Sequence, residues 1–207
     1  MDFCFSSSFI PYSSASSGDN IDEAQLIVRT VELKDIKGLT DVLTHSFHPR
    51  QGLWYWFYPL LKLGIYEDLR SRLRSSSPHY RCLVASKVVY SVTVEEEIVG
   101  TAEIAIRPGA IASTQSPYIS NLAVSQVHRR QGIARQLLSG CEQVAREWGY
   151  QTISLHVLED NHSAKQLYFT SGYQLHRIEC SLSSCLFNRP RRLLLHKKVS
   201  QGDNTSK

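Results

Sequence analysis

The feature that constrains this chain most is a change in hydrophobic periodicity around residue 132. Before it, Ile119, Leu122 and Val124 lie among β-forming residues, which predicts a strand. After it, apolar side chains recur at helical spacing, at Ile133, Leu137, Leu138, Cys141, Val144, Ala145 and Trp148. The chain must therefore fold so that a strand end, a short loop and a helix start follow one another directly.

The loop between this strand and this helix favours the binding of an anion. The first N–H groups of a helix have no partner within it and lie at the positive end of its dipole, so they suit a phosphate. Gly132 leaves room for a ligand beside the backbone, and Ala134 keeps the next turn small. Arg129, Arg130 and Arg135 add positive charge at the same place.

The loop reads Arg129-x-x-Gly132-x-Ala134 and matches the pattern Arg/Gln-x-x-Gly-x-Gly/Ala. It has neither the lysine and serine or threonine that end a nucleoside-triphosphate loop nor the three glycines of a dinucleotide loop. Two further segments accompany it in order: Asn121-Leu122-Ala123-Val124 before it, and Asn161…Ala164-x-x-Leu167-Tyr168-x-x-x-Gly172-Tyr173 after it. Together they resemble the GNAT superfamily of acetyl-CoA-dependent N-acetyltransferases, over about residues 25–199, and among its members the plant plastid protein acetyltransferases.

The periodicity of the remaining chain predicts an α/β (α+β) fold with a mixed sheet and helices on both faces. The predicted strands span residues 26–30, 81–94, 98–107, 118–124, 153–157, 173–179 and 192–199. Helices are predicted over residues 35–47, 54–74 and 133–148, and from the cap Asn161 to Gly172. The acidic run Glu95-Glu96-Glu97 is predicted as the turn of a hairpin. The resemblance adds two central parallel strands that splay apart and admit the cofactor.

The resemblance implies how acetyl-CoA would bind. Its pyrophosphate would contact the backbone of Arg130, Gln131, Gly132, Ile133, Ala134 and Arg135. Its pantetheine arm would contact the backbone of Leu122, Ala123 and Val124, for which an ordinary buried strand is the alternative. Further cofactor contacts would come from Asn161, His162, Ser163 and Tyr168.

Two side chains are candidates for proton transfer. Tyr168 follows Ala164 by one helical turn and would donate to the leaving sulfur, either as an acid or as a strong hydrogen-bond donor; a half-buried core tyrosine is the alternative. Glu103 would take the proton of the acceptor amine through water, and a solvated strand residue is the alternative. His156 is a weaker candidate for this base.

Composition excludes several other classes of function. The 207 residues with 42% hydrophobic content suit one domain, and five cysteines without a CxxC pair favour a reducing compartment. Neither His45 nor His48 has a partner at metal-ligand spacing, so we expect no metal. No run is long and apolar enough for a membrane span, and a scattered net charge of +4 does not favour nucleic-acid binding.

The ends of the chain differ from residues 25–199. Residues 1–20 hold seven serines and no lysine or arginine, which fits a plastid transit peptide or a disordered tail, and residues 200–207 are expected to be a disordered tail. A plastid location is therefore expected, with cytoplasm or nucleus as alternatives.

The expected reaction is acetyl transfer to protein or peptide N-terminal α-amines and to lysines. A small-amine acetyltransferase acting on an arylalkylamine or polyamine is an alternative, because the aromatic run at residues 54–58 could border either kind of acceptor. A CoA-binding regulatory module without turnover is the third reading. The sequence leaves the acceptor and the oligomeric state open.

Overall fold

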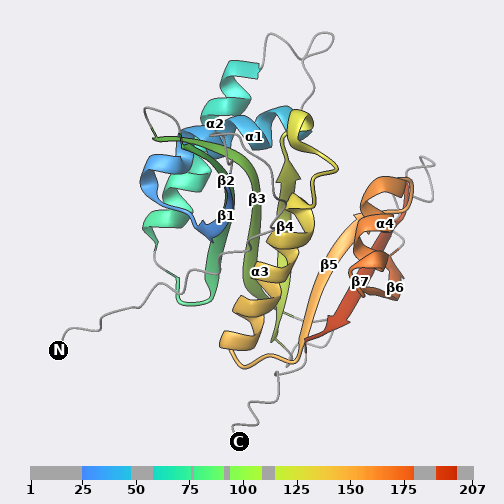
Figure 1. Cartoon of the computed structure of the whole chain (residues 1–207). Helices are drawn as coiled ribbons and strands as arrows, with labels where there is room; N and C mark the ends of the chain where they lie inside the picture. The colour runs from blue at the N-terminus through green and yellow to red at the C-terminus, as the bar shows by residue number, and fades with distance from the viewer. Residues whose placement is uncertain are drawn as a thin grey trace, which may run out of the picture.

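The computed structural model describes residues 25–47, 58–75, 77–90, 94–108, 115–179 and 190–199. Over these ranges the chain forms one seven-stranded sheet in the order β1-β2-β3-β4-β5-β7-β6 (Figure 1). The strands are β1 (Gln25–Thr30), β2 (Tyr80–Tyr90), β3 (Val94–Pro108), β4 (Gln115–Val124), β5 (Thr152–Leu158), β6 (Gln174–Glu179) and β7 (Arg192–Lys198). β4 and β5 run parallel and all other neighbours antiparallel. The predicted mixed sheet is thus confirmed.

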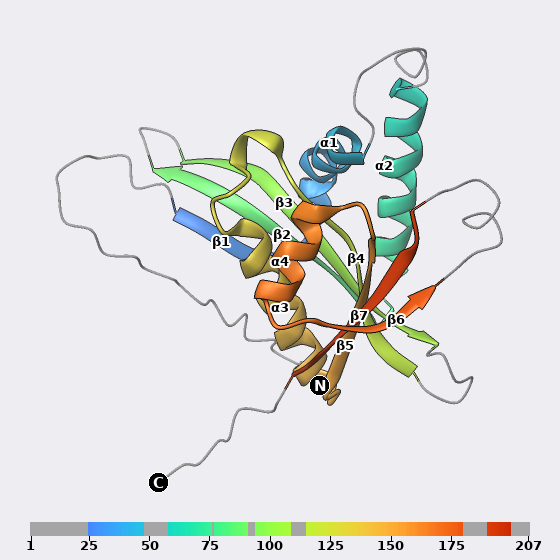
Figure 2. The same ribbon diagram turned by 90° about the vertical axis from the view of Figure 1, so that its right-hand side faces the viewer.

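Four helices of the described residues cover the two faces of this sheet. α1 (Ile36–Phe47) and α2 (Tyr58–Arg74) lie on one face, and α3 (Ile133–Glu147) and α4 (His162–Thr170) lie on the other (Figure 2). Each pair encloses its own core, built around Leu39 and Leu69 on the first face and around Leu137 and Ile153 on the second. Among the described residues, no helix combines the length and the apolar character that crossing a membrane requires.

Helix α3 begins and ends at glycines with left-handed backbone conformations. Gly132 is its N-cap, with a φ of 81°, and Gly149 follows its C-terminal end with a φ of 80°. A β-carbon at Gly100 of β3 would come within 3.1 Å of the Ile133 and Leu137 side chains. The helix therefore packs closely on β3, which fixes the position of its N-terminus relative to the strand ends.

The two parallel strands separate soon after they meet. β4 and β5 are paired only at Tyr118 with Ser154 and at Ile119 with Leu155. From Ser120 to Val124, β3 is the only strand among the described residues that pairs with β4. Figure 1 shows the gap between the two strands widening toward the N-terminal end of α3. This arrangement agrees with the splay that the sequence resemblance implied.

The structure corrects the predicted acidic turn. Glu95, Glu96 and Glu97 are part of β3, paired with Val89, Val88 and Lys87. Positive side chains of neighbouring strands offset the repulsion between these glutamates. Lys87 lies opposite Glu97, and the Arg29 guanidinium of β1 contacts Glu96 at 2.6 Å. The connection between β2 and β3 therefore falls in residues 91–93, which lie outside the described residues.

Other predicted boundaries shift by a few residues. β4 begins at Gln115 rather than at residue 118, and Tyr173, predicted to open a strand, is instead a core residue that is 2% exposed. The described part of the second helix begins at Tyr58, so most of the aromatic run at 54–58 lies outside the described residues, as do the predicted leader and tail.

Candidate active site

The N-terminus of α3 forms a positively charged, uncapped helix start. Gly132 supplies no capping side chain, and a β-carbon there would meet no atom within 4 Å. Arg130 is exposed and has a φ of 65°, so two residues with left-handed backbone lie within three positions. Such alternation turns successive N–H groups toward one side, which is the geometry of an anion-binding nest. This local structure fits the predicted phosphate seat, which stays a prediction.

The other predicted loop residues differ in how they are placed. Gln131 is exposed, whereas Ile133 is 3% exposed and belongs to the core below the loop, with Ala134 half-buried next to it. The Arg135 guanidinium donates to the Thr170 hydroxyl of α4 at 3.2 Å, and the Arg129 side chain donates to the Val124 carbonyl at 3.3 Å. Arginines thus surround the helix start and join α3 to both sides of the gap.

The strand end that leads into this loop offers backbone groups to a ligand. Ala123 is buried, and Leu122 and Val124 are half-buried against the α3 core. Within the described residues, β5 does not pair with this part of β4, so backbone groups other than the Val124 carbonyl, which accepts from Arg129, can contact an elongated, amide-containing molecule. Together with the open space at Gly132, these backbone groups fit acetyl-CoA with its pantetheine arm in the gap.

Helix α4 brings its predicted residues to the opposite side of the gap. The Asn161 side chain caps the helix by accepting from the Ala164 N–H at 3.1 Å, and His162 and Ser163 are exposed in the first turn. Tyr168 is 9% exposed, and its ring packs edge-on against Tyr173 at 6.0 Å between ring centroids. Burial, with a smaller effect of Tyr118, raises the pKa of Tyr168 to about 12.

A second tyrosine lies next to a histidine where the gap begins. The Tyr118 hydroxyl of β4 is 2.9 Å from Nδ1 of His156 on β5, and Nε2 of His156 is 3.0 Å from the Glu179 carboxylate on β6. Burial lowers the pKa of His156, Arg192 lowers it further, and Glu179 opposes the shift. Nδ1 of His156 and the Tyr118 hydroxyl share a hydrogen bond whose direction depends on the histidine tautomer, and the Glu179 carboxylate forms an ion pair with the ring when His156 is protonated.

Glu103 is neither solvated nor free. It is 1% exposed on β3, and its two carboxylate oxygens accept from Asn121 Nδ2 at 2.9 Å and from Arg72 at 3.0 Å. The alternative of a solvated strand residue is therefore wrong. The roles of Tyr118 and of the Asn121 side chain escaped the sequence reasoning because their partners, His156 and Glu103, are distant in the sequence.

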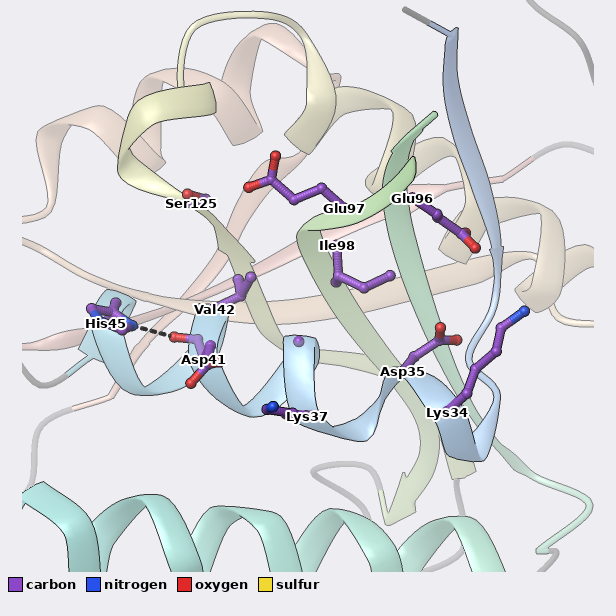
Figure 3. A pocket seen from close by; sticks show the side chains of 11 residues that line it. Lys34, Asp35, Lys37, Asp41, Val42, His45, Glu96, Glu97, Ile98 and Ser125 are labelled. Atoms are coloured by element: carbon purple, nitrogen blue, oxygen red, sulfur yellow. Dashed lines mark hydrogen bonds between the residues drawn. The ribbon is translucent and has the colours of Figure 1, made fainter. Parts of the chain in front are cut away.

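No group of three or more histidine, cysteine, aspartate or glutamate side chains that could hold a metal occurs within the described residues. A cavity of about 570 Å³ lies elsewhere, between α1 and the start of β3 (Figure 3). It contains none of the predicted site residues. Two of its carboxylates, Asp35 and Glu96, pair with Arg29, and a third, Asp41, pairs with Lys62.

Comparisons with known proteins agree with this geometry. A protein of Arabidopsis thaliana, GCN5-related N-acetyltransferase 10, chloroplastic, is 27% identical over 175 residues, which cover 80% of this chain and 68% of the relative. The ribosomal-protein-S18-alanine N-acetyltransferase from Escherichia coli superposes with a TM-score of 0.57 at 14% identity, covering 88% of this chain and 99% of the other.

A third similarity comes from a structure that contains coenzyme A, the PaiA N-acetyltransferase from Thermoplasma acidophilum. Its TM-score is 0.56 at 18% identity, and the match covers 84% of this chain and 99% of that one. The family model of the acetyltransferase (GNAT) family matches residues 44–173, which include the gap, the loop and α4. The chain therefore belongs to the GNAT family of acetyl-CoA-dependent acetyltransferases.

Proposed function

We propose that this protein transfers the acetyl group of acetyl-CoA to the α-amines of protein or peptide N-termini, and more slowly to lysine ε-amines. The cofactor supplies the acetyl group as a thioester. The backbone of residues 130–135 holds its phosphates. The backbone of Leu122, Ala123 and Val124 holds the pantetheine arm, and one of its amides donates to the thioester oxygen. Asn161, His162 and Ser163 contribute from the first turn of α4.

The observation that carries the proposal is the contact between Tyr118, His156 and Glu179 beside the gap. A histidine whose pKa is lowered is a weak base, so it suits an amine that is already partly neutral. An α-amine with a pKa near 8 has a sizeable neutral fraction at neutral pH. A lysine with a pKa near 10.4 costs about 3 kcal/mol more to deprotonate. The site therefore favours N-termini over lysines.

In this mechanism the Tyr118 hydroxyl takes the amine proton while its own proton passes to Nδ1 of His156. Tyr168 donates a hydrogen bond to the leaving sulfur. The alternative prediction, in which Glu103 is the base, stays a prediction. Both oxygens of its carboxylate already accept hydrogen bonds, from Asn121 and from Arg72.

Turnover of an acceptor panel tests the proposed function. The panel contains a lysine-free peptide with a free α-amine, the same peptide acetylated at its N-terminus with one lysine added, serotonin and spermidine. We expect acetyl transfer mainly to the first peptide, and we expect the His156→Asn variant to lose this activity. Turnover on the small amines alone would move the function to metabolite acetylation. Tight CoA binding without turnover on any acceptor would favour a regulatory module.

We also propose that the protein acts in the plastid. The serine-rich residues 1–20 and the chloroplastic relative at 27% identity support this location. Fluorescent fusions of the full chain and of residues 21–207 test it. Plastid fluorescence that depends on residues 1–20 is expected, and equal cytoplasmic or nuclear fluorescence of both fusions would contradict it.

A further inference from the structure

Strand β4 contains a bulge directly before the residues that face the gap. Thr101 of β3 pairs with Ala123 and Glu103 pairs with Ser120, so Asn121 and Leu122 of β4 lie opposite the single residue Ala102. Asn121 has a φ of 51°, a left-handed conformation that L-residues rarely adopt. A bulge changes the direction in which the following backbone groups point. The amides of residues 122–124 therefore owe their orientation to the backbone of Asn121.

The buried carboxylate of Glu103 holds this unusual backbone in place. The Asn121 side-chain amide donates to Oε1 of Glu103 at 2.9 Å, across the strand pair. Glu103 is 1% exposed, so this hydrogen bond forms where water does not compete with it. Asn121 is thereby tied to the neighbouring strand by its side chain at the position where the regular backbone pairing is interrupted.

The second oxygen of Glu103 connects the bulge to a helix on the α1/α2 face. Oε2 accepts from the Arg72 guanidinium of α2 at 3.0 Å, and Arg72 is itself held by Asp68, one turn earlier, at 2.7 Å. A chain of contacts thus runs from α2 through Glu103 to Asn121 and to the strand end that borders the gap.

We propose that Glu103 is a positioning residue. Through Asn121 it fixes the β4 bulge, so that an amide within residues 122–124 points at the thioester oxygen, and through Arg72 it links this alignment to α2. The proposal deepens the acetyl transfer described above and rests on it. It differs from the role of a base, since Glu103 acts on the backbone of β4 and exchanges no proton with the acceptor.

Substitutions at Glu103 and Asn121 separate these two roles. Glu103→Gln keeps an oxygen for Asn121, so positioning predicts a fall in kcat of less than about 10-fold and an unchanged rising limb of the pH profile. A lost general base predicts a fall of about 100-fold or more.

Asn121→Ala should lower kcat about 10-fold or more with a nearly constant KM for acetyl-CoA. Asn121→Gly should lower kcat less, because glycine accepts the left-handed backbone. Glu95→Gln, on the exposed end of the same strand, is the matched control.

A spectroscopic measurement tests the alignment without any acceptor. The carbonyl carbon of bound [1-¹³C]acetyl-CoA should resonate downfield of the free molecule in the wild-type protein, in Glu103→Gln and in Glu95→Gln, and return toward the free value in Asn121→Ala. If Asn121→Ala does not fold, faster amide exchange at residues 122–124 in unliganded Asn121→Gly than in Glu95→Gln is the expected result.

Two outcomes would overturn the proposal. One is a loss of about 100-fold in Glu103→Gln together with wild-type kinetics in both Asn121 variants. The other is an unshifted carbonyl signal, or unaltered amide exchange, when Asn121 is replaced. A protein that acetylates no acceptor in the panel but shows the carbonyl shift and its loss in Asn121→Ala would refute the proposed function and retain the positioning role.

Discussion

Tyr168 is deeply buried, and we propose that its hydroxyl group acts on the departing thiolate. With a pKa of about 12, transfer of its proton to a thiolate with a pKa near 8.5 is uphill by about 5 kcal/mol. A hydrogen bond to the sulfur needs no such transfer. The group is therefore better suited to donate than to ionise.

This predicts a moderate effect of Tyr168→Phe. Loss of one hydrogen bond to a charged group corresponds to about 10- to 100-fold in kcat. The KM for acetyl-CoA should stay nearly constant, because the phosphates are held elsewhere. Steady-state assays of thiol release measure both constants, with Tyr150→Phe, beyond the far end of α3, as the control. Unchanged kcat in Tyr168→Phe would contradict a role at the sulfur.

The residue scale also yields a pH dependence. His156 must be neutral to take a proton, and its pKa lies below 6.5 because of burial and Arg192, against the opposing effect of Glu179. The part of the rising limb of kcat/KM that depends on His156 should therefore have its midpoint below pH 6.5, and His156→Asn should lower kcat/KM about 100-fold or more. Rates measured from pH 5 to 8 check this. A rising limb that survives unchanged in His156→Asn would assign the base to another group.

Among the elements, helix α3 allows its proposed phosphate-binding start to be compared with its opposite end, which has the same backbone conformation. Gly132 and Gly149 have φ values of 81° and 80°, and a β-carbon would meet nothing within 4 Å at either position. An alanine should thus cost each variant a similar amount of stability, about 1–2 kcal/mol. Only Gly132→Ala should also raise the KM for acetyl-CoA, by about 10-fold.

Thermal unfolding and steady-state kinetics on the two variants measure both effects. The comparison isolates the ligand, because backbone strain is common to the two positions. An equal rise of KM in Gly149→Ala, or none in Gly132→Ala, would contradict a phosphate seat at this loop.

The sequence predicted those helices and strands whose boundaries depend on residues close together in the chain. The glycines and the apolar spacing from Ile133 to Trp148 predicted α3 and its ends within a residue or two. The turn at Glu95 was misplaced because consecutive glutamates are typical of a solvated loop. In the fold, Arg29 and Lys87 of neighbouring strands lie next to these glutamates and offset their charge. A charge run alone does not reveal its neutralising partners.

The features of the candidate site likewise fall into those that could be predicted from nearby residues and those that could not. The loop at Gly132 and the cap Asn161 could be predicted, since both act through backbone geometry within a few residues. The pairing of Tyr118 with His156, and of Glu103 with Arg72, could not, because 38 and 31 residues separate the partners. Whether Glu103 is solvated or buried is decided by how β3 and α2 pack, which one sequence does not specify.

At the scale of the molecule, two histidines make folding sensitive to mild acid. Burial lowers the pKa of both His156 and His196, and the stacked His176, 4.0 Å from His196 between ring centroids, lowers the latter further. The unfolded chain therefore binds more protons than the folded one just below pH 6.5. Stability is fully present above that pH and falls as pH decreases through the lower folded pKa values.

Urea midpoints between pH 5 and 8 should thus decrease below about pH 6.5, and less steeply in His196→Gln than in the exposed control His162→Gln. Carboxylates such as Asp35, whose pKa is lowered chiefly by Arg29 against burial, lose their contribution only below about pH 4. The histidines and the carboxylates therefore affect stability in two different pH ranges. A midpoint that stays constant from pH 8 to 5 would contradict the histidine contribution.

Hydrogen exchange of the full chain with and without acetyl-CoA shows directly where the cofactor binds. Binding in the gap between β4 and β5 predicts new protection at residues 120–124, at 130–135 and in the first turns of α4, and no change around the cavity beside Lys37 and His45. Protection concentrated at that cavity, with residues 120–135 exchanging as before, would show that acetyl-CoA does not enter the gap between β4 and β5.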